Sequence, residues 1–149
     1  MGKTIQVFLA GIIQGSKVEA AIHSQDWRET IKRGLVRNVA DVEVHCQYSL
    51  HPNSITYDMP GIRRTIEEGN RVAAESDVLV AFVPSASMGT AIEMYEAYRA
   101  GAVVLTISPL EANWVLRAYS HRIFPDVTAF EDFLAGGGLT ALLREQDLA

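Results

Sequence analysis

The chain lacks the features that mark several large classes of protein. It has one cysteine in 149 residues, Cys46, which excludes an internal disulfide and favours a reducing compartment. Because Cys46 lies in an apolar stretch, a structural thiol is the expected role. No apolar run approaches the roughly 20 residues that span a bilayer, and the amino terminus lacks the layout of a signal peptide. We therefore expect a cytoplasmic protein without a membrane partner.

An excess of positive charge and the spacing of metal ligands are also missing. The net charge of −5 argues against a nucleic-acid partner, which normally requires a basic patch, although a small anionic ligand stays compatible. The four histidines are scattered without a metal-site spacing. The GxGxxG and P-loop motifs are absent too. We expect no metal and no cofactor.

What the chain does contain is an alternation of strand-like and helix-like segments. Short apolar stretches predict strands over residues 5–10, 42–47, 78–83, 102–107 and 122–124. Helices are expected over residues 18–37, 62–75, 88–101, 111–119, 129–134 and 139–145, with a long loop over 48–61. This alternation predicts a single α/β domain over residues 1–149. Its five-stranded parallel sheet is flanked by helices in a flavodoxin-like or Rossmann-like three-layer sandwich.

The most informative segment joins the third predicted strand to the next helix. The turn that opens this helix comprises Ser85, Ser87, Met88, Gly89 and Thr90. Glu93 follows at the start of the helix. Ligands of parallel sheets bind beyond the carboxyl ends of the strands, where a helix N-terminus favours anions. From the residues alone, N-capping by Ser87 or Thr90 and a dipole-complementing role for Glu93 explain the pattern equally well.

A second loop is expected at the same edge of the sheet. It follows the first strand and contains Gly11, Ile13 and Gly15. Its glycines allow backbone amides to approach a ligand closely, and a plain turn is the alternative. The loop over residues 108–113, after the fourth strand, should converge on the same place.

Three motifs, taken in order, resemble the nucleoside 2-deoxyribosyltransferase superfamily. They are Val7-Phe8-Leu9-Ala10-Gly11, Ser76-Asp77-Val78 and Gly89-Thr90-Ala91-Ile92-Glu93. The superfamily includes transferases that move deoxyribose between bases and hydrolases that cleave the N-glycosidic bond of nucleoside 5'-monophosphates. The resemblance implies that Glu93 is the nucleophile that attacks the anomeric carbon. This role suits a carboxylate, which stabilises a developing oxocarbenium ion and can trap it covalently.

Two positions depart from the pattern of the transferases. Ser87 stands where they commonly carry an aspartate that contacts the sugar 5'-hydroxyl, whereas the hydrolases have a serine that contacts the 5'-phosphate. A hydroxyl can donate to a phosphate that a carboxylate would repel, so the resemblance points to a phosphorylated nucleoside. Gly69 stands where an aspartate usually handles the leaving base. Glu68, Asn70 and Asp58 are the candidates to replace it.

The resemblance also implies a homo-oligomer in which a neighbouring subunit completes each site. Asn113 and Arg117 lie in the corresponding stretch, and Arg117 could reach a phosphate across an interface; a solvated helix face is the equal alternative. The expected activity is cleavage of a (deoxy)nucleoside 5'-monophosphate through a glycosyl-Glu93 intermediate, releasing free base. The alternatives are base exchange on deoxynucleosides and nucleotide binding without turnover.

Overall fold

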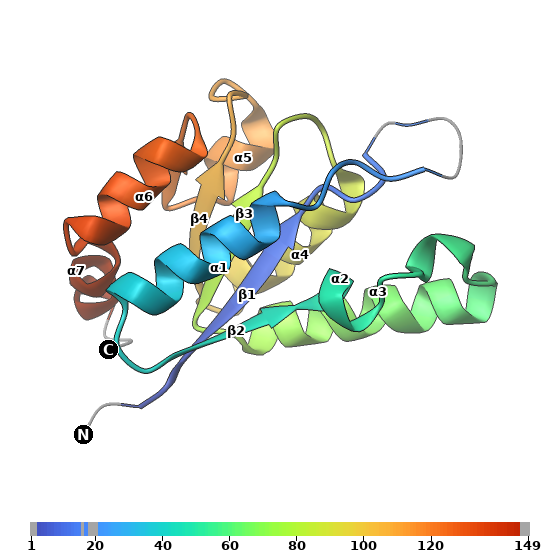
Figure 1. The fold of residues 1–149 in the computed structure, drawn as a ribbon, viewed down its shortest axis with the longest axis horizontal. Coiled ribbons are helices and arrows are strands. Elements are labelled where there is room, and N and C mark those ends of the chain that lie inside the picture. The colour runs from blue at the N-terminus through green and yellow to red at the C-terminus, as the bar shows by residue number, and fades with distance from the viewer. Residues whose placement is uncertain (1–2, 16, 18–20, 147–149) are drawn as a thin grey trace.

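A parallel sheet forms the centre of the molecule. The computed structural model describes residues 3–15, 17 and 21–146 (Figure 1). Its strands are β1 (Ile5–Gly11), β2 (Val42–Cys46), β3 (Val78–Phe82), β4 (Val103–Ile107) and β5 (Arg122–Phe124). All neighbours pair in parallel, in the order β2-β1-β3-β4-β5. Apart from the exposed Gln6 in β1, the residues of the three central strands are buried or partly buried, which is why these strands read as nearly continuous apolar runs.

Helices cover both faces of the sheet and give a three-layer sandwich (Figure 1). The first face is covered by α1 (Trp27–Asn38), α6 (Val127–Ala135) and α7 (Gly138–Glu145). The second is covered by α3 (Met59–Glu75), α4 (Met88–Arg99) and α5 (Trp114–Ala118). The short helix α2 (Gln47–Leu50) and the 3₁₀ turn η1 (Ser54–Thr56) connect β2 to α3. The predicted α/β class and parallel sheet are confirmed.

The strand order places a switch point between β1 and β3. The chain leaves β1 towards α1 on one face and leaves β3 towards α4 on the other. Gly11 and Phe82, the last residues of these strands, pair with each other in the register. Doubly wound sheets bind their ligands in the crevice that opens at such a point.

The helix predicted over residues 18–37 is wrong at its start, because α1 begins at Trp27. Residues 18–20 lie outside the described residues, and 21–26 are not helical. The amide of Gln25 explains the difference: its Nε2 donates to the carbonyls of Ile12 and His23, at 3.1 and 2.8 Å. The His23 amide also donates to the Ile13 carbonyl at 2.6 Å. These bonds tie residues 23–25 back onto the first loop.

The predicted loop over residues 48–61 also needs correction. It contains most of α2, all of η1 and the first turn of α3, which starts at Met59 rather than at residue 62. The Asp58 Oδ1 accepts a hydrogen bond from the Gly61 amide at 2.9 Å, and Pro60 occupies the first turn. An N-cap followed by proline is a regular helix start. In the described ranges no helix is both long and apolar enough to cross a membrane.

Candidate active site

The Glu93 carboxylate lies between α4 and α3, against bare backbone. A Cβ added to Gly69 would stand 3.1 Å from Glu93 Oε2. Gly69 is buried, and Glu93 is partly buried. The absence of a side chain at position 69 therefore creates the recess that holds the carboxylate. Glu68 and Asn70, the neighbours of Gly69 on α3, project about 100° to either side of this position.

The environment of Glu93 disfavours its charge. Burial raises the pKa of Glu93 from its usual value of 4.5 to about 7, and the positive charge of Arg28 acts in the opposite direction. A carboxyl group in a crevice whose pKa lies near 7 is a recognised mark of a functional site. Here it coincides with the switch point of the sheet, so geometry and electrostatics indicate the same place.

Arg28 is the main charged neighbour of this carboxylate, and the sequence reasoning missed it. It is the second residue of α1, is buried, and is held at three points. Its Nε donates to Gln25 Oε1 at 2.6 Å, its Nη1 to Cys46 Sγ at 3.3 Å, and its Nη2 to the Gly11 carbonyl at 3.4 Å. Cys46 is partly buried, and its thiol serves as a structural acceptor, as expected.

Two aromatic rings complete the enclosure of the guanidinium. Arg28 Cζ lies 4.2 Å from the centre of the Trp27 ring and 5.1 Å from that of Tyr48. Burial lowers the pKa of Arg28, against which Cys46 and Glu93 raise it. An arginine stays protonated at neutral pH under such opposing effects. A sequence signal for it existed: a cation in the first turn of a helix opposes the helix dipole.

Gln47 is a second residue that the sequence did not single out. It is buried directly after β2, and its Cγ lies 3.6 Å from the Cβ position of Gly69. Its Nε2 donates to the Thr65 carbonyl at 3.4 Å, and its Oε1 accepts from His45 Nε2 at 2.9 Å. The carboxamide therefore borders the same recess as Glu93.

The turn before α4 is capped as expected. Ser87 Oγ accepts from the Thr90 amide at 3.4 Å and shares a 2.8 Å hydrogen bond with Thr90 Oγ1. Thr90 is buried, whereas Met88 and Gly89 are exposed. Within the described part of the chain, a Cβ added to Gly89 would meet no atom within 4 Å beyond its chain neighbours and the backbone of its own helix. The backbone at the start of α4 is thus open on the side where Glu93 follows.

The first loop serves mainly to shape the crevice. A Cβ on Gly11 would collide with the Trp27 indole, so glycine is required for that ring to pack at the end of β1. Gly15 has a φ of +60°, a left-handed conformation that favours glycine. Ile13 is partly buried, and its carbonyl accepts from the His23 amide.

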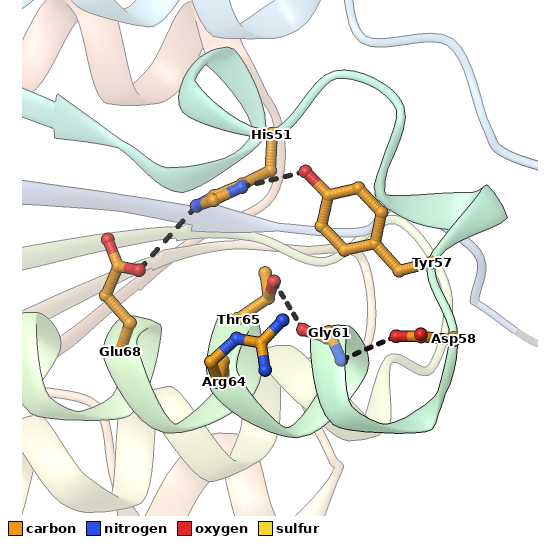
Figure 2. A pocket seen from close by; sticks show the side chains of 7 residues that line it. All are labelled: His51, Tyr57, Asp58, Gly61, Arg64, Thr65 and Glu68. Carbon is orange, nitrogen blue, oxygen red and sulfur yellow. Dashed lines mark hydrogen bonds and ion pairs between the residues drawn. The ribbon is translucent and has the colours of Figure 1, made fainter.

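A pocket of about 350 Å³ adjoins the recess (Figure 2). Its lining comprises His51, Tyr57, Asp58, Gly61, Arg64, Thr65 and Glu68. Glu68 points into this pocket rather than towards Glu93, and its Oε2 lies 3.7 Å from His51 Nε2. Asp58 lies at the far end, where it caps α3. Two residues predicted near the substrate thus share one pocket: Glu68 is the residue before Gly69, and Asp58 lies about three helical turns before it.

The last two predicted residues are exposed: Asn113 precedes α5 as its N-cap, and Arg117 lies in the helix. Asn113 Oδ1 accepts from the amides of Val115 and Leu116 at 3.0 and 3.2 Å and so caps α5. Arg117 is exposed. Among the residues described, no group of three His, Cys, Asp or Glu side chains is placed to hold a metal ion.

Solved structures share this fold. A 2-deoxyribosyltransferase from Bacillus psychrosaccharolyticus superposes with a TM-score of 0.63 at 16% identity, covering 85% of this chain and 90% of that one. The CMP N-glycosidase BcmB of Clostridium botulinum gives 0.54 at 20%, covering 87% and 97%. A conserved protein from Enterococcus faecalis V583 gives 0.60 at 13%, covering 89% and 98%. Neither protein-family models nor curated proteins gave a match. The fold implied by the sequence motifs is therefore confirmed.

Proposed function

We propose that this protein is an N-glycosidase of the nucleoside 2-deoxyribosyltransferase superfamily that acts on (deoxy)nucleoside 5'-monophosphates. The observation that carries the proposal is the position of Glu93. Its carboxylate lies in a recess at the switch point of the sheet, against Gly69, with its pKa raised to about 7. A partly desolvated carboxylate gains more from meeting a developing cation than a hydrated one does.

The reaction proceeds in two steps. The ionised Glu93 attacks C1' of the sugar as the glycosidic C–N bond breaks, and the electron pair of that bond leaves with the base. The product is a glycosyl ester on Glu93, in which the carboxylate charge has been neutralised. Water then attacks C1', and its oxygen replaces the Glu93 oxygen, which releases the sugar phosphate. The fixed cation of Arg28 keeps a fraction of Glu93 ionised for the first step.

The 5'-phosphate fits the start of α4. Ser87 carries a hydroxyl there, and the neighbouring backbone at Met88 and Gly89 is exposed. The N-terminus of this 12-residue helix carries partial positive charge and amides that favour a phosphate. The first loop, with Gly11, Ile13 and Gly15, follows β1 beside it and adds backbone groups at the same edge.

Gly69 supports a second candidate, a nucleotide-binding module without turnover, because no side chain at that position can assist the leaving base. Base exchange on deoxynucleosides is the third. A catalytic protein releases free base in molar excess over enzyme. A transferase gives an exchange product faster than hydrolysis when a second base is added. A binding module gives neither, although nucleotides would still raise its melting temperature.

We also propose that two copies of the chain associate through α4 and α5 and share their sites. Met88, Ile92 and Tyr95 follow one another along α4 at helical spacing and are exposed, Met88 by 83%. Trp114 on α5 is 86% exposed, and Val115 beside it is exposed as well. The rings of Tyr95 and Tyr119, the residue that ends α5, meet at 5.2 Å, so the two helices adjoin. Exposed aromatic and apolar side chains on adjoining elements are typical of an interface. Asn113 caps the same short helix, and Arg117 lies in it, so both are placed where they could enter the site of a neighbouring copy.

The function is tested by incubating the protein with the 5'-monophosphates of the common ribo- and deoxynucleosides and separating the free bases chromatographically. We expect at least one to yield base, and Glu93→Gln to reduce the rate by about 1,000-fold or more. Glu96→Gln, one turn further along α4, is the matched control and should keep the wild-type rate. No release from any nucleotide, or full release by Glu93→Gln, would overturn the proposal.

A further inference from the structure

Three side chains that can carry a proton stand in a row in the pocket beside the recess. His51 stands between a carboxylate and a phenol (Figure 2). Its Nε2 lies 3.7 Å from Glu68 Oε2, and its Nδ1 shares a 3.0 Å hydrogen bond with the Tyr57 hydroxyl. The rings of His51 and Tyr57 meet edge to face at 5.9 Å. In this arrangement a protonated His51 can pass the proton on its Nδ1 to the Tyr57 oxygen, while the Glu68 carboxylate faces its Nε2.

The cluster lies one helical turn from the recess. The His51 amide donates to the Gln47 carbonyl at 3.1 Å, so the two residues are separated by a single turn, about 5.4 Å along the axis. Gln47 contacts the Gly69 position, and Glu93 Oε2 contacts it as well. On α3, Thr65 of the pocket precedes Gly69 by one turn, and Glu68 is its neighbour. A base attached to a sugar at Glu93 can therefore extend past Gln47 towards Tyr57.

A departing base needs a proton, because a nitrogen anion is a poor leaving group. Glycine at position 69 cannot supply it, and Glu68, the adjacent acid, is directed to His51 instead. We propose that Tyr57, backed by His51 and Glu68, protonates the leaving base. This inference rests on the proposed N-glycosidase activity. It gives Tyr57 a catalytic role that the motifs of the superfamily do not imply.

The proton transfers balance. As the glycosidic bond breaks, its electron pair goes to the base nitrogen, which takes the Tyr57 hydroxyl proton. The Nδ1 proton of the His51 imidazolium moves to the Tyr57 oxygen, leaving a neutral imidazole with its remaining proton on Nε2, facing Glu68. When water attacks the glycosyl ester, it releases a proton that recharges His51. Tyr57 is the group that touches the base, and His51 and Glu68 are positioning and supplying residues.

The test compares two leaving groups that differ in their need for a proton. Guanosine 5'-monophosphate loses a base that must be protonated, whereas 7-methylguanosine 5'-monophosphate loses a base whose ring charge already accepts the electron pair. Uridine and 5-nitrouridine 5'-monophosphates are the pair to use if the protein cleaves only pyrimidines. We expect Tyr57→Phe and His51→Gln to lower kcat on the unactivated nucleotide by about 100-fold or more, and on the activated one by less than threefold. Tyr119→Phe is the matched control, because the Tyr119 ring packs on Tyr95 and Tyr98 of α4 and does not line this pocket.

Each outcome decides the matter. Retained rate on the activated nucleotide shows that the variant is folded, so a selective loss on the unactivated one supports the assignment. Equal loss on both nucleotides gives the cluster a structural role only, and no loss on either removes it from the reaction; both overturn the inference while the proposed function stands. If the wild-type protein releases base from none of the common 5'-monophosphates, the proposed function has failed, and the inference fails with it.

Discussion

Glu93 on α4 and Gly69 on α3 face each other so closely that a Cβ at position 69 would lie 3.1 Å from the Glu93 carboxylate. This relationship defines the candidate site. The glycine lies in the interior of a 17-residue helix, where it costs stability compared with alanine. A glycine at position 69 leaves the space that the Glu93 carboxylate occupies.

The first prediction concerns Gly69→Ala. The alanine should gain about 0.5–1 kcal/mol of helix propensity, partly offset by the contact with the carboxylate, so thermal unfolding should stay at or above the wild-type temperature. Base release should fall about tenfold, because the methyl group displaces Glu93 Oε2 by a few tenths of an ångström or more. Calorimetry and the base-release assay measure the two effects. Gly34→Ala on α1, where the nearest side-chain atom is 3.5 Å from the Cβ position, is the control.

The second prediction is the pH dependence of the rate. The nucleophile must be ionised, and its pKa is raised to about 7, so kcat/KM should rise steadily from pH 5.5 towards pH 7. An unperturbed glutamate would give a plateau already from about pH 5.5. A profile flat between pH 5.5 and 8 would contradict the account of the site.

The third prediction is the linked change in stability. Because the folded-state pKa of Glu93 lies above its unfolded value of 4.5, the favourable contribution is complete below 4.5 and is lost as the pH rises through about 7. Glu93→Gln removes a charge that is costly to bury. Its melting temperature relative to wild type should therefore increase from pH 4.5 to pH 8, by a few degrees in a domain of this size. A constant difference across this range would mean that Glu93 is freely hydrated.

The fourth prediction concerns Arg28→Met. Removing the cation takes away the interaction that lowers the pKa of Glu93, so the acidic limb of the rate profile should move to higher pH. The rate at pH 7 should therefore fall below that of the wild type. Arg37→Met, exposed in the last turn of the same helix, should leave the profile in place. A profile unmoved by Arg28→Met would exclude electrostatic coupling between the two groups.

The fifth prediction addresses association. Replacing the exposed Trp114 by serine should weaken a dimer built on α4 and α5 without destabilising the monomer, since the indole is 86% exposed within one chain. Light scattering coupled to size exclusion measures the mass directly. A wild-type protein that is monomeric at high concentration would contradict the proposed interface.

The sequence predicted the parts of this molecule that are encoded in consecutive residues. The buried strand β3, the turn capped by Ser87 and the place of Glu93 on the next helix all follow from one continuous segment between residues 76 and 93. A single segment is enough for these predictions, because a buried parallel strand and a capped helix start can each be recognised from a few consecutive residues.

Arg28 and Gln47 could not be found in this way. Their roles come from contacts between elements: Arg28 reaches Cys46 across 18 residues, and Gln47 meets Gly69 from another helix. The start of α1 was misplaced for a related reason. The Gln25 side chain donates to the backbone carbonyls of Ile12 and His23, and these bonds hold the segment before Trp27 outside the helix. Such tertiary hydrogen bonds override local helix propensity.

The central claim, that Glu93 is the nucleophile, is tested most directly by trapping its ester. A 2'-fluorinated analogue of a cleaved nucleotide slows the second step, because fluorine destabilises the cationic transition state. Intact-protein mass spectrometry should then reveal one fluorinated sugar phosphate per chain, located by peptide mapping on Glu93 and absent from Glu93→Gln. Release of base with no adduct, or an adduct on another residue, would contradict the account.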